Sequence, residues 1–150
     1  MRTTAVSVLA ILPRSEDQAC LSQIFSHSKW NLRLVDGLAP ARPLIDELAA
    51  GVVITDHRLP DGHWRDVLLD LQCREIEPVL IVASRLADDG LWAEVLNLGG
   101  YDVLGTPFQA AEVVRAVSIA WRHWQDRALN RDRILSDAMA AGARALSATF

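Results

Sequence analysis

An uncharged run of five residues, 51–55, lies in the middle of the chain, and Asp56 follows it directly. Valine, isoleucine and threonine predominate in this run, and their branched side chains favour extended backbone. A strand that is apolar at nearly every position is typical of a sheet covered on both faces. The run therefore predicts a buried strand in an α/β fold, with Asp56 at its carboxyl end.

Short apolar runs and segments of helical period alternate along the rest of the chain. The strands are expected at residues 5–12, 31–35, 51–55, 78–83 and 101–104. Five helices are expected between and after these strands: one that begins at Ser15, one over 42–50, one over 64–71, one from Asp88 to Gly99, and one after Thr106-Pro107. In the second of them, Pro43 falls in the first turn, where proline is tolerated. Leu91, Trp92, Val95 and Leu96 are expected to form the buried face of the fourth helix. This order predicts a doubly wound, five-stranded parallel sheet, strand order 2-1-3-4-5, with helices on both faces.

Composition narrows the class of protein. The length of 150 residues suits one compact domain, and the net charge of −4 argues against a general nucleic-acid binder. No apolar run approaches the ~20 residues of a membrane helix, so we expect no membrane segment. Cys20 and Cys73 fall on apolar helix faces and are interpreted as core thiols of a reduced, cytoplasmic protein.

The predicted topology places the functional crevice before any family is considered. In open parallel sheets, ligands bind beyond the carboxyl ends of the strands where the strand order reverses, here between strands 1 and 3. The segments that meet there are 12–15, 56–58, 83–85 and 105–107. Asp56 is the one carboxylate that a buried strand delivers into this crevice, although an aspartate that ends a strand can also simply form a turn.

The segment 52–62, Val-Val-Ile-Thr-Asp-His-Arg-Leu-Pro-Asp-Gly, resembles the phosphoacceptor strand and loop of response-regulator receiver domains. Thr106-Pro107-Phe108 occupies the place of that family's Lys-Pro-Phe, in which the prolyl bond is usually cis. The resemblance covers about residues 4–125. It implies a flavodoxin-like receiver domain over 1–125, followed by a C-terminal helical extension or tail over 126–150. It also implies that Asp56 is the phosphoacceptor in two-component (phosphorelay) signalling. The expected partner is a histidine kinase or another signalling protein.

Other positions of the family's phosphate site are altered. Leu12 and Pro13 stand where receivers carry an acidic pair, Ala83 replaces the hydroxyl residue with Ser84 one place late, and Thr106 replaces the lysine. We therefore expect no firmly bound cofactor, and only weak Mg²⁺ binding at Asp56 and the backbone carbonyl of Arg58. Glu16 and Asp17 are interpreted as partners of a helix dipole. Phosphorylation of Asp56 is expected to be slow or absent.

Three readings of the function remain open. The first is a stand-alone response regulator phosphorylated on Asp56, and the second is a pseudo-receiver that acts as an interaction or dimerisation module without phosphorylation. A flavodoxin-like ligand-binding or enzymatic domain is a third, but the chain has no phosphate loop and no nucleophile with a base, so we do not expect an enzyme. Arg14, Arg58 or Arg85 could pair with Asp56 and hold one signalling state, or all three could point to solvent.

Two further features bear on partners. Trp92, Tyr101 and Trp121 are interface candidates on the face of helix 4, strand 5 and helix 5, which receivers commonly use, although core packing is the alternative for the tryptophans. Residues 121, 124, 128, 135, 138 and 145 approximate an a/d stripe, which fits either a dimerising helix or a frayed tail. We expect a homodimer, through the helix 4 to helix 5 face.

Overall fold

The expected parallel sheet is present in the computed structural model, which describes residues 6–149 and their side chains as far as Arg144. Its strands are β1 (Ser7–Ile11), β2 (Asn31–Val35), β3 (Val52–Asp56), β6 (Val79–Ser84) and β7 (Asp102–Gly105). All pairings are parallel, and the order is β2-β1-β3-β6-β7. Because β6 and β7 are the fourth and fifth strands of this sheet, the predicted order 2-1-3-4-5 is confirmed. Ala5, which we placed in the first strand, lies outside the described residues.

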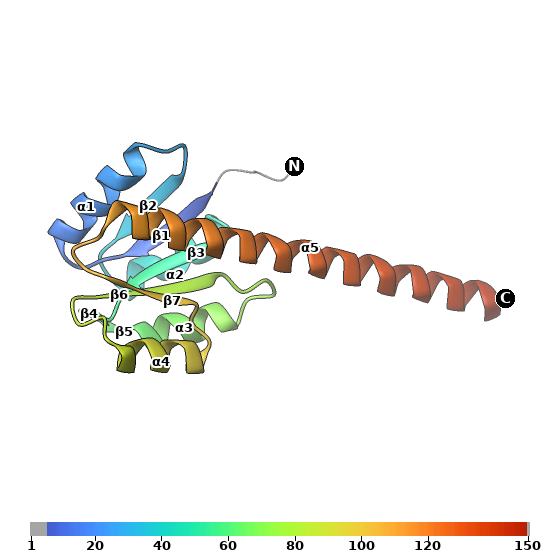
Figure 1. Cartoon of the computed structure of the whole chain (residues 1–150). Coiled ribbons are helices and arrows are strands. Elements are labelled where there is room, and N and C mark those ends of the chain that lie inside the picture. Colours follow the sequence, from blue (N-terminus) through green and yellow to red (C-terminus); the bar gives the residue numbers. More distant parts are fainter. Residues whose placement is uncertain (1–5, 150) are drawn as a thin grey trace.

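Five helices cover the sheet in two layers (Figure 1). They are α1 (Ser15–Ser26), α2 (Leu38–Glu47), α3 (Trp64–Gln72), α4 (Asp89–Leu98) and α5 (Ala110–Thr149). α1 and α5 pack on one face, whereas α2, α3 and α4 pack on the other. A two-stranded hairpin, β4 (Arg58–Leu59) and β5 (Gly62–His63), follows β3.

The strands of the sheet's centre are buried on both faces because their alternate side chains enter two different cores. In β3, Val52 and Ile54 face α1 and α5, while Val53 faces the other layer. β1 and β6 alternate in the same way, and almost all of their side chains are buried. This double burial explains why the run before Asp56 is apolar at successive positions.

The second helix begins four residues earlier than predicted. α2 starts at Leu38, so Pro43 lies inside it rather than in its first turn. The carboxylate of Asp61, far away in sequence, accepts hydrogen bonds from the backbone N–H groups of Leu38 (2.8 Å) and Ala39 (2.9 Å). These groups have no partner within a helix, and Pro40 has no N–H that needs one. A long-range contact thus sets the start of this helix.

The fourth helix has the predicted ends but a narrower buried face. The Asp88 side chain accepts a hydrogen bond from the Leu91 backbone N–H (2.8 Å), and Gly99 ends the helix with a left-handed φ of 112°. Leu91 and Val95 are buried as predicted. The prediction was wrong for Trp92 and Leu96, which are 50% and 36% exposed and so lie toward solvent.

Trp121 is buried, which contradicts its assignment as an interface candidate. Its ring stacks with that of Trp124 at a centroid distance of 4.9 Å, and both rings pack over Gly51 at the start of β3. Burying these large rings helps to fix α5 on the sheet. The prediction for Cys73 was also wrong, because this thiol is exposed at the end of α3, whereas Cys20 is partly buried against the core.

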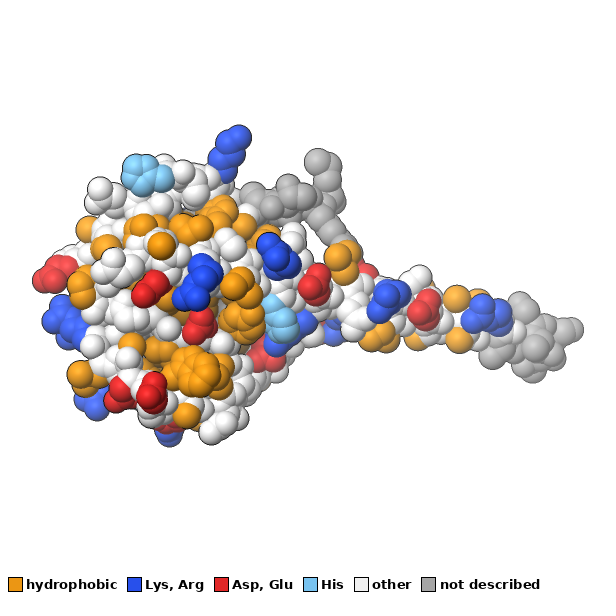
Figure 2. Space-filling model, in the orientation of Figure 1, with side chains coloured by type: hydrophobic (Ala, Val, Ile, Leu, Met, Phe, Trp, Pro, Cys, Tyr) orange, Lys and Arg blue, Asp and Glu red, His pale blue; other side chains and the backbone are white. Residues whose placement is uncertain are grey.

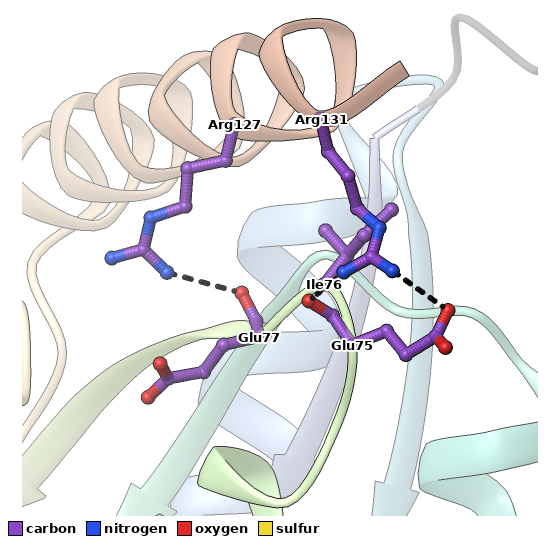
Figure 3. A pocket seen from close by; sticks show the side chains of 5 residues that line it. All are labelled: Glu75, Ile76, Glu77, Arg127 and Arg131. Atoms are coloured by element: carbon purple, nitrogen blue, oxygen red, sulfur yellow. Dashed lines mark hydrogen bonds and ion pairs between the residues drawn. The ribbon is translucent and has the colours of Figure 1, made fainter. Parts of the chain in front are cut away.

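α5 continues far past the sheet as one helix of 40 residues, about 60 Å long at 1.5 Å per residue (Figure 1). Two arginines hold it where it leaves the body (Figure 3): Arg127 donates to the carbonyl of Glu77 (3.2 Å), and Arg131 contacts both the carbonyl (2.9 Å) and the carboxylate (3.2 Å) of Glu75. The helix crosses residue 125 without a break, so the domain boundary placed there stays a prediction. The side chain of Ala145, part of the expected a/d stripe, lies outside the described residues.

Candidate functional site

Three of the four segments that were expected to form a site, 12–15, 56–58 and 83–85, line one crevice, whereas none of the residues that line it comes from 105–107. The side chains of Val8, Ala10 and Leu12 point into the core between the sheet and helices α1 and α5. Those of Val79, Ile81 and Ala83 point into the same core. Asp56 follows Ile54 by two residues, and Thr106 follows Leu104 by two, so both are placed toward the same layer. The carboxylate of Asp56 therefore lies at the carboxyl edge of the sheet, beneath the start of α1.

Asp56 is partly exposed in a crevice of about 290 Å³. The crevice is lined by Pro13, Arg14, Asp56, His57, Arg58, Ser84, Arg85 and Leu86. One carboxylate oxygen, Oδ1, accepts a hydrogen bond from the backbone N–H of Arg58 at 3.2 Å. The backbone N–H of His57 donates to the carbonyl of Ala83 at 2.8 Å, which ties the loop after β3 to β6. The carboxylate is thus held in place while part of it stays accessible to a ligand.

The arginines surround this crevice without neutralising Asp56. Arg14, Arg58 and Arg85 all have exposed side chains, and within residues 6–149 no ion pair joins any of them to Asp56. Arg85 instead lies 3.6 Å from the carboxylate of Glu16. The ion pair considered in the sequence analysis is therefore not formed in this structure. The three guanidinium groups give the crevice a positive rim around one carboxylate.

Leu12 and Thr106 directly follow β1 and β7, and Ala83 lies in β6. Leu12 and Ala83 are fully buried, and Ala83 is the register partner of Asp56 across β3 and β6. The hydroxyl of Ser84 accepts a hydrogen bond from the backbone N–H of Leu86 (3.1 Å). The Thr106 backbone N–H donates to the carbonyl of Ser84 (3.1 Å), and the Thr106–Pro107 peptide bond is cis. Apolar side chains therefore flank Asp56 on both neighbouring strands.

Asp17, in the first turn of α1, is buried, whereas the sequence analysis interpreted it as a partner of the helix dipole. It is only 5% exposed, and its Oδ2 atom is buried without a hydrogen-bond partner. Desolvation, and after it the negative charge of Asp56, raises the pKa of Asp17 above its usual value. The buried residues of α1 are Asp17, Leu21 and Phe25, which are spaced by four. That spacing, visible in the sequence, was the signal that Asp17 faces the sheet rather than solvent.

Two histidines lie in the loop that follows Asp56. The rings of His57 and His63 meet edge to face with centroids 5.1 Å apart, and Nδ1 of His63 accepts a hydrogen bond from the Arg65 backbone N–H at the start of α3. Burial, with the neighbouring cations Arg58 and Arg65, lowers the pKa of both imidazoles. Both are therefore neutral at neutral pH, and His57 presents an uncharged ring to the crevice.

The donor set limits the chemistry that the crevice can support. Within the described part of the chain, no group of three histidine, cysteine, aspartate or glutamate side chains is arranged to hold a metal ion. Mg²⁺, however, is often bound through one or two carboxylates, with waters completing its coordination. Asp56 and the orphaned oxygen of Asp17 are oxygen donors of this kind. The crevice therefore combines the accessible carboxylate of Asp56 with a positive rim of three arginines.

Comparison with solved structures identifies the fold. The signal receiver domain of a protein described as a LuxO repressor from Vibrio parahaemolyticus superposes with a TM-score of 0.76 at 20% identity, over 83% of this chain and 96% of that one. The beryllofluoride-activated NtrC4 receiver domain dimer gives a TM-score of 0.72 at 20% identity, over 79% and 98%. The chemotaxis response regulator CheY4 of Vibrio cholerae gives 0.70 at 13% identity, over 78% and 99%.

The chain thus has the receiver-domain fold, a flavodoxin-like, doubly wound sheet. No protein-family model and no curated protein matches the sequence. At 13–20% identity the similarity establishes the arrangement of the backbone, while the residues of the crevice have to be argued from their own chemistry. Over residues 6–149, none of the helices is long and apolar enough to cross a membrane.

Proposed function

We propose that this chain is a receiver domain of two-component signal transduction, with Asp56 as the acceptor of a phosphoryl group from a histidine kinase or another signalling protein. One observation carries the proposal: Asp56 ends the central strand of a receiver fold and opens into the crevice at the switch point between β1 and β3. Ligands of such sheets bind at this place. No other strand end among residues 6–149 brings an accessible carboxylate there.

The geometry around Asp56 suits an in-line attack by its carboxylate. The Arg58 N–H holds Oδ1, so the carboxylate keeps one orientation. An oxygen of Asp56 would form the new P–O bond while the P–N bond of a phosphohistidine breaks and the imidazole takes up a proton. The rim formed by Arg14, Arg58 and Arg85 would attract the dianionic phosphoryl group and complement its oxygens.

The same site makes phosphorylation slow. Thr106 stands in place of the family's lysine, so the attraction between a lysine cation and the phosphoryl oxygens is lost. Two unit charges ~4 Å apart at an effective dielectric near 20 attract each other by about 4 kcal/mol. A threonine hydroxyl returns one neutral hydrogen bond, worth about 1 kcal/mol net. Mg²⁺, when bound at Asp56 and the backbone carbonyl of Arg58, would neutralise charge on the transferring oxygens. Leu12 and Pro13 offer it no side-chain oxygen.

A second function is favoured by a specific observation, the apolar surroundings of Asp56. Leu12 and Ala83, both fully buried, replace polar groups on the two neighbouring strands. A receiver built this way would act as a phosphorylation-independent pseudo-receiver, an interaction or dimerisation module controlled by binding of its partner.

We infer a homodimer for either function, formed through the face of α4, β7 and α5. Trp92 is 50% exposed on α4, and Val114 is 45% exposed on α5. Figure 2 shows hydrophobic side chains gathered over these elements among scattered charges. Tyr101 is partly exposed beside them and stacks on His123 at 5.3 Å. Exposed aromatic side chains of this kind are frequent at the centres of protein interfaces.

Intact-protein mass spectrometry tests the proposed function. The full chain is incubated with a small-molecule acyl phosphate with and without Mg²⁺, beside Asp56→Asn and a standard receiver domain. A single Mg²⁺-dependent phosphoryl adduct that is absent from Asp56→Asn is the expected result, with slower labelling than in the standard receiver. No adduct under conditions that label the standard receiver would overturn the phosphoacceptor function and favour the pseudo-receiver.

A further inference from the structure

The projecting part of α5 leaves the domain at a joint that polar side chains make. Up to this joint, Trp121 and Trp124 hold the helix on the sheet. Arg127 and Arg131 follow at a spacing of three or four residues, which keeps them on the same side of the helix. Beyond Arg131, every described side chain, as far as Arg144, is exposed. Arg131 is therefore the last partly buried side chain in the described part of α5.

Both arginines reach the loop 73–78, which joins α3 to β6 (Figure 3). Arg127 donates to the carbonyl oxygen of Glu77 at 3.2 Å, and Arg131 donates to that of Glu75 at 2.9 Å. A second nitrogen of Arg131 lies 3.2 Å from the Glu75 carboxylate, which is 84% exposed and so adds little. The fork of donors on a guanidinium suits such a double contact. The joint thus depends mainly on where the loop backbone lies.

The two arginines span a gap rather than a packed interface. A hollow of about 250 Å³ separates the helix from the loop and is lined by Glu75, Ile76, Glu77, Arg127 and Arg131. A neighbouring hollow of about 440 Å³ is lined in part by Ile134 and Leu135, which are 58% and 48% exposed. Opening a packed apolar contact would expose its surface to water, which is unfavourable. Hydrogen bonds across an open gap can instead be exchanged for bonds to water at a small net cost.

The acceptors of the joint are fixed to the sheet, whereas its donors are fixed to the helix. Arg74 in the loop forms an ion pair with Asp46 on α2. At the end of the loop, the Val79 backbone N–H donates to the carbonyl of Gly51 beside β3 at 2.8 Å. A change in the direction of α5 therefore has to break the bonds of Arg127 and Arg131.

We propose that Arg127, Arg131 and the loop 73–78 form a releasable clamp that sets the direction in which α5 projects from the domain. In the clamped state, the helix and the sheet move as one body. In the released state, the helix keeps its helical form and pivots at the turn that follows Trp124. The clamp is a conformational device of the fold, and it does not depend on phosphorylation of Asp56.

Electron–electron double resonance between two spin labels tests the clamp in the full chain. The native cysteines are replaced by Cys20→Ala and Cys73→Ser, and labels are attached at Ser22→Cys on α1 and Ala140→Cys on α5, both exposed positions. An excess of unlabelled chain removes distances between copies. The clamped helix should give one narrow distance distribution. The double variant Arg127→Ala, Arg131→Ala should broaden it, because alanine preserves the helix and removes the clamp.

Two matched controls separate the clamp from a general effect of charge. Arg133→Ala removes an arginine that donates to Asn130 of the same helix at 2.8 Å. Glu77→Gln changes a side chain of the loop and leaves the carbonyl that Arg127 uses. Both variants should keep the narrow distribution of the parent chain.

The outcomes decide the proposal directly. A broad distribution in the parent chain, equal widths in the parent and the double variant, or equal broadening by Arg133→Ala would overturn the clamp. Far-UV circular dichroism separates pivoting from unwinding, and an unchanged helical signal is expected. A helical signal that falls in the double variant and not in Arg133→Ala would overturn the pivot, because the arginines would then maintain the helix instead of directing it. The single variant Arg131→Ala repeats the measurement if the double variant folds poorly.

Discussion

The carboxylate of Asp61 accepts a hydrogen bond of 2.8 Å from the backbone N–H of Leu38 and thereby joins the loop after Asp56 to the start of α2. A second bond, from Ala39 at 2.9 Å, makes the contact bidentate. Gly37, at the N-cap, has no side chain that could do this, and an added Cβ there would come within 2.9 Å of Asp61. The loop that follows the candidate acceptor is therefore tied to a helix on the opposite face of the sheet.

Replacement of this cap should destabilise the protein in a pH-dependent way. The two backbone N–H groups lower the pKa of Asp61 below the usual 3.8. Its stabilising contribution is therefore present above pH 3.8 and is lost as the pH falls through the lower, folded-state pKa. Asp61→Ala should reduce the urea midpoint at pH 7, and Asp61→Asn should reduce it less. Equal midpoints for Asp61→Ala and the control Asp137→Asn, an exposed carboxylate on α5, would contradict the capping role.

Two glycines should respond to alanine in opposite directions. A Cβ on Gly51 would lie 2.6–2.7 Å from atoms of Trp121 and Trp124, whereas one on Gly142 would meet nothing within 4 Å. Gly51→Ala should cost about 1–3 kcal/mol by overpacking. Gly142→Ala, within α5, should stabilise the helix by about 0.5–1 kcal/mol. Urea unfolding followed by circular dichroism measures both, and a stabilising Gly51→Ala would show that the tryptophans are not packed on β3.

Trp64 is the largest fully buried side chain and begins α3 directly after the loop. Trp64→Ala should lower the free energy of unfolding by about 3–5 kcal/mol, as for other buried aromatic truncations. Trp64→Phe should cost less, because it also removes an indole N–H that has no hydrogen-bond partner. Trp92→Ala, at a half-exposed position, is the matched control and should change the stability of the monomer, compared at a protein concentration that keeps the chain monomeric, by no more than about 0.5 kcal/mol. Comparable losses for Trp64→Ala and Trp92→Ala would contradict this packing.

The fold and the place of Asp56 at the end of the central strand were predictable because they depend on local patterns. The apolar run before Asp56 exists because β3 lies between two cores, and the strand order follows from the alternation of strands and helices. The start of α2 was not predictable in the same way, because Asp61 caps it from another part of the chain. The helical period predicted that Trp92 and Trp121 lie on helices. It did not predict that the sheet would bury Trp121 and leave Trp92 half-exposed.

The site was predictable only in part for a related reason. Sequence patterns placed Asp56 and the altered positions Leu12, Ala83 and Thr106 at the strand ends, but they do not report desolvation. Asp17 was assigned to the helix dipole because first-turn carboxylates usually face solvent. Only the packing of α1 on the sheet shows that its side chain is buried without a donor.

The two loop histidines should make the native state sensitive to acid. Burial lowers the pKa of His57 and His63 below the usual 6.5, so the unfolded chain binds protons more readily than the native state. The stability tied to these rings is present above pH 6.5 and is lost as the pH falls through their folded-state pKa values. The double variant His57→Asn, His63→Asn should flatten the fall in urea midpoint between pH 7 and 5. An unchanged slope would exclude these rings as its cause.

Self-association should depend on the outer face of α4 rather than on the free part of α5. Trp92 lies on the face proposed for the dimer, whereas Leu129 and Ile134, 53% and 58% exposed, lie on the part of α5 near and beyond Arg131. Trp92→Ser should shift the chain toward monomer in sedimentation-velocity experiments, because it removes a large, half-exposed apolar side chain from that face. Ile134→Ser should leave the dimer intact. The reverse result, dissociation by Ile134→Ser and none by Trp92→Ser, would assign dimerisation to the projecting part of α5.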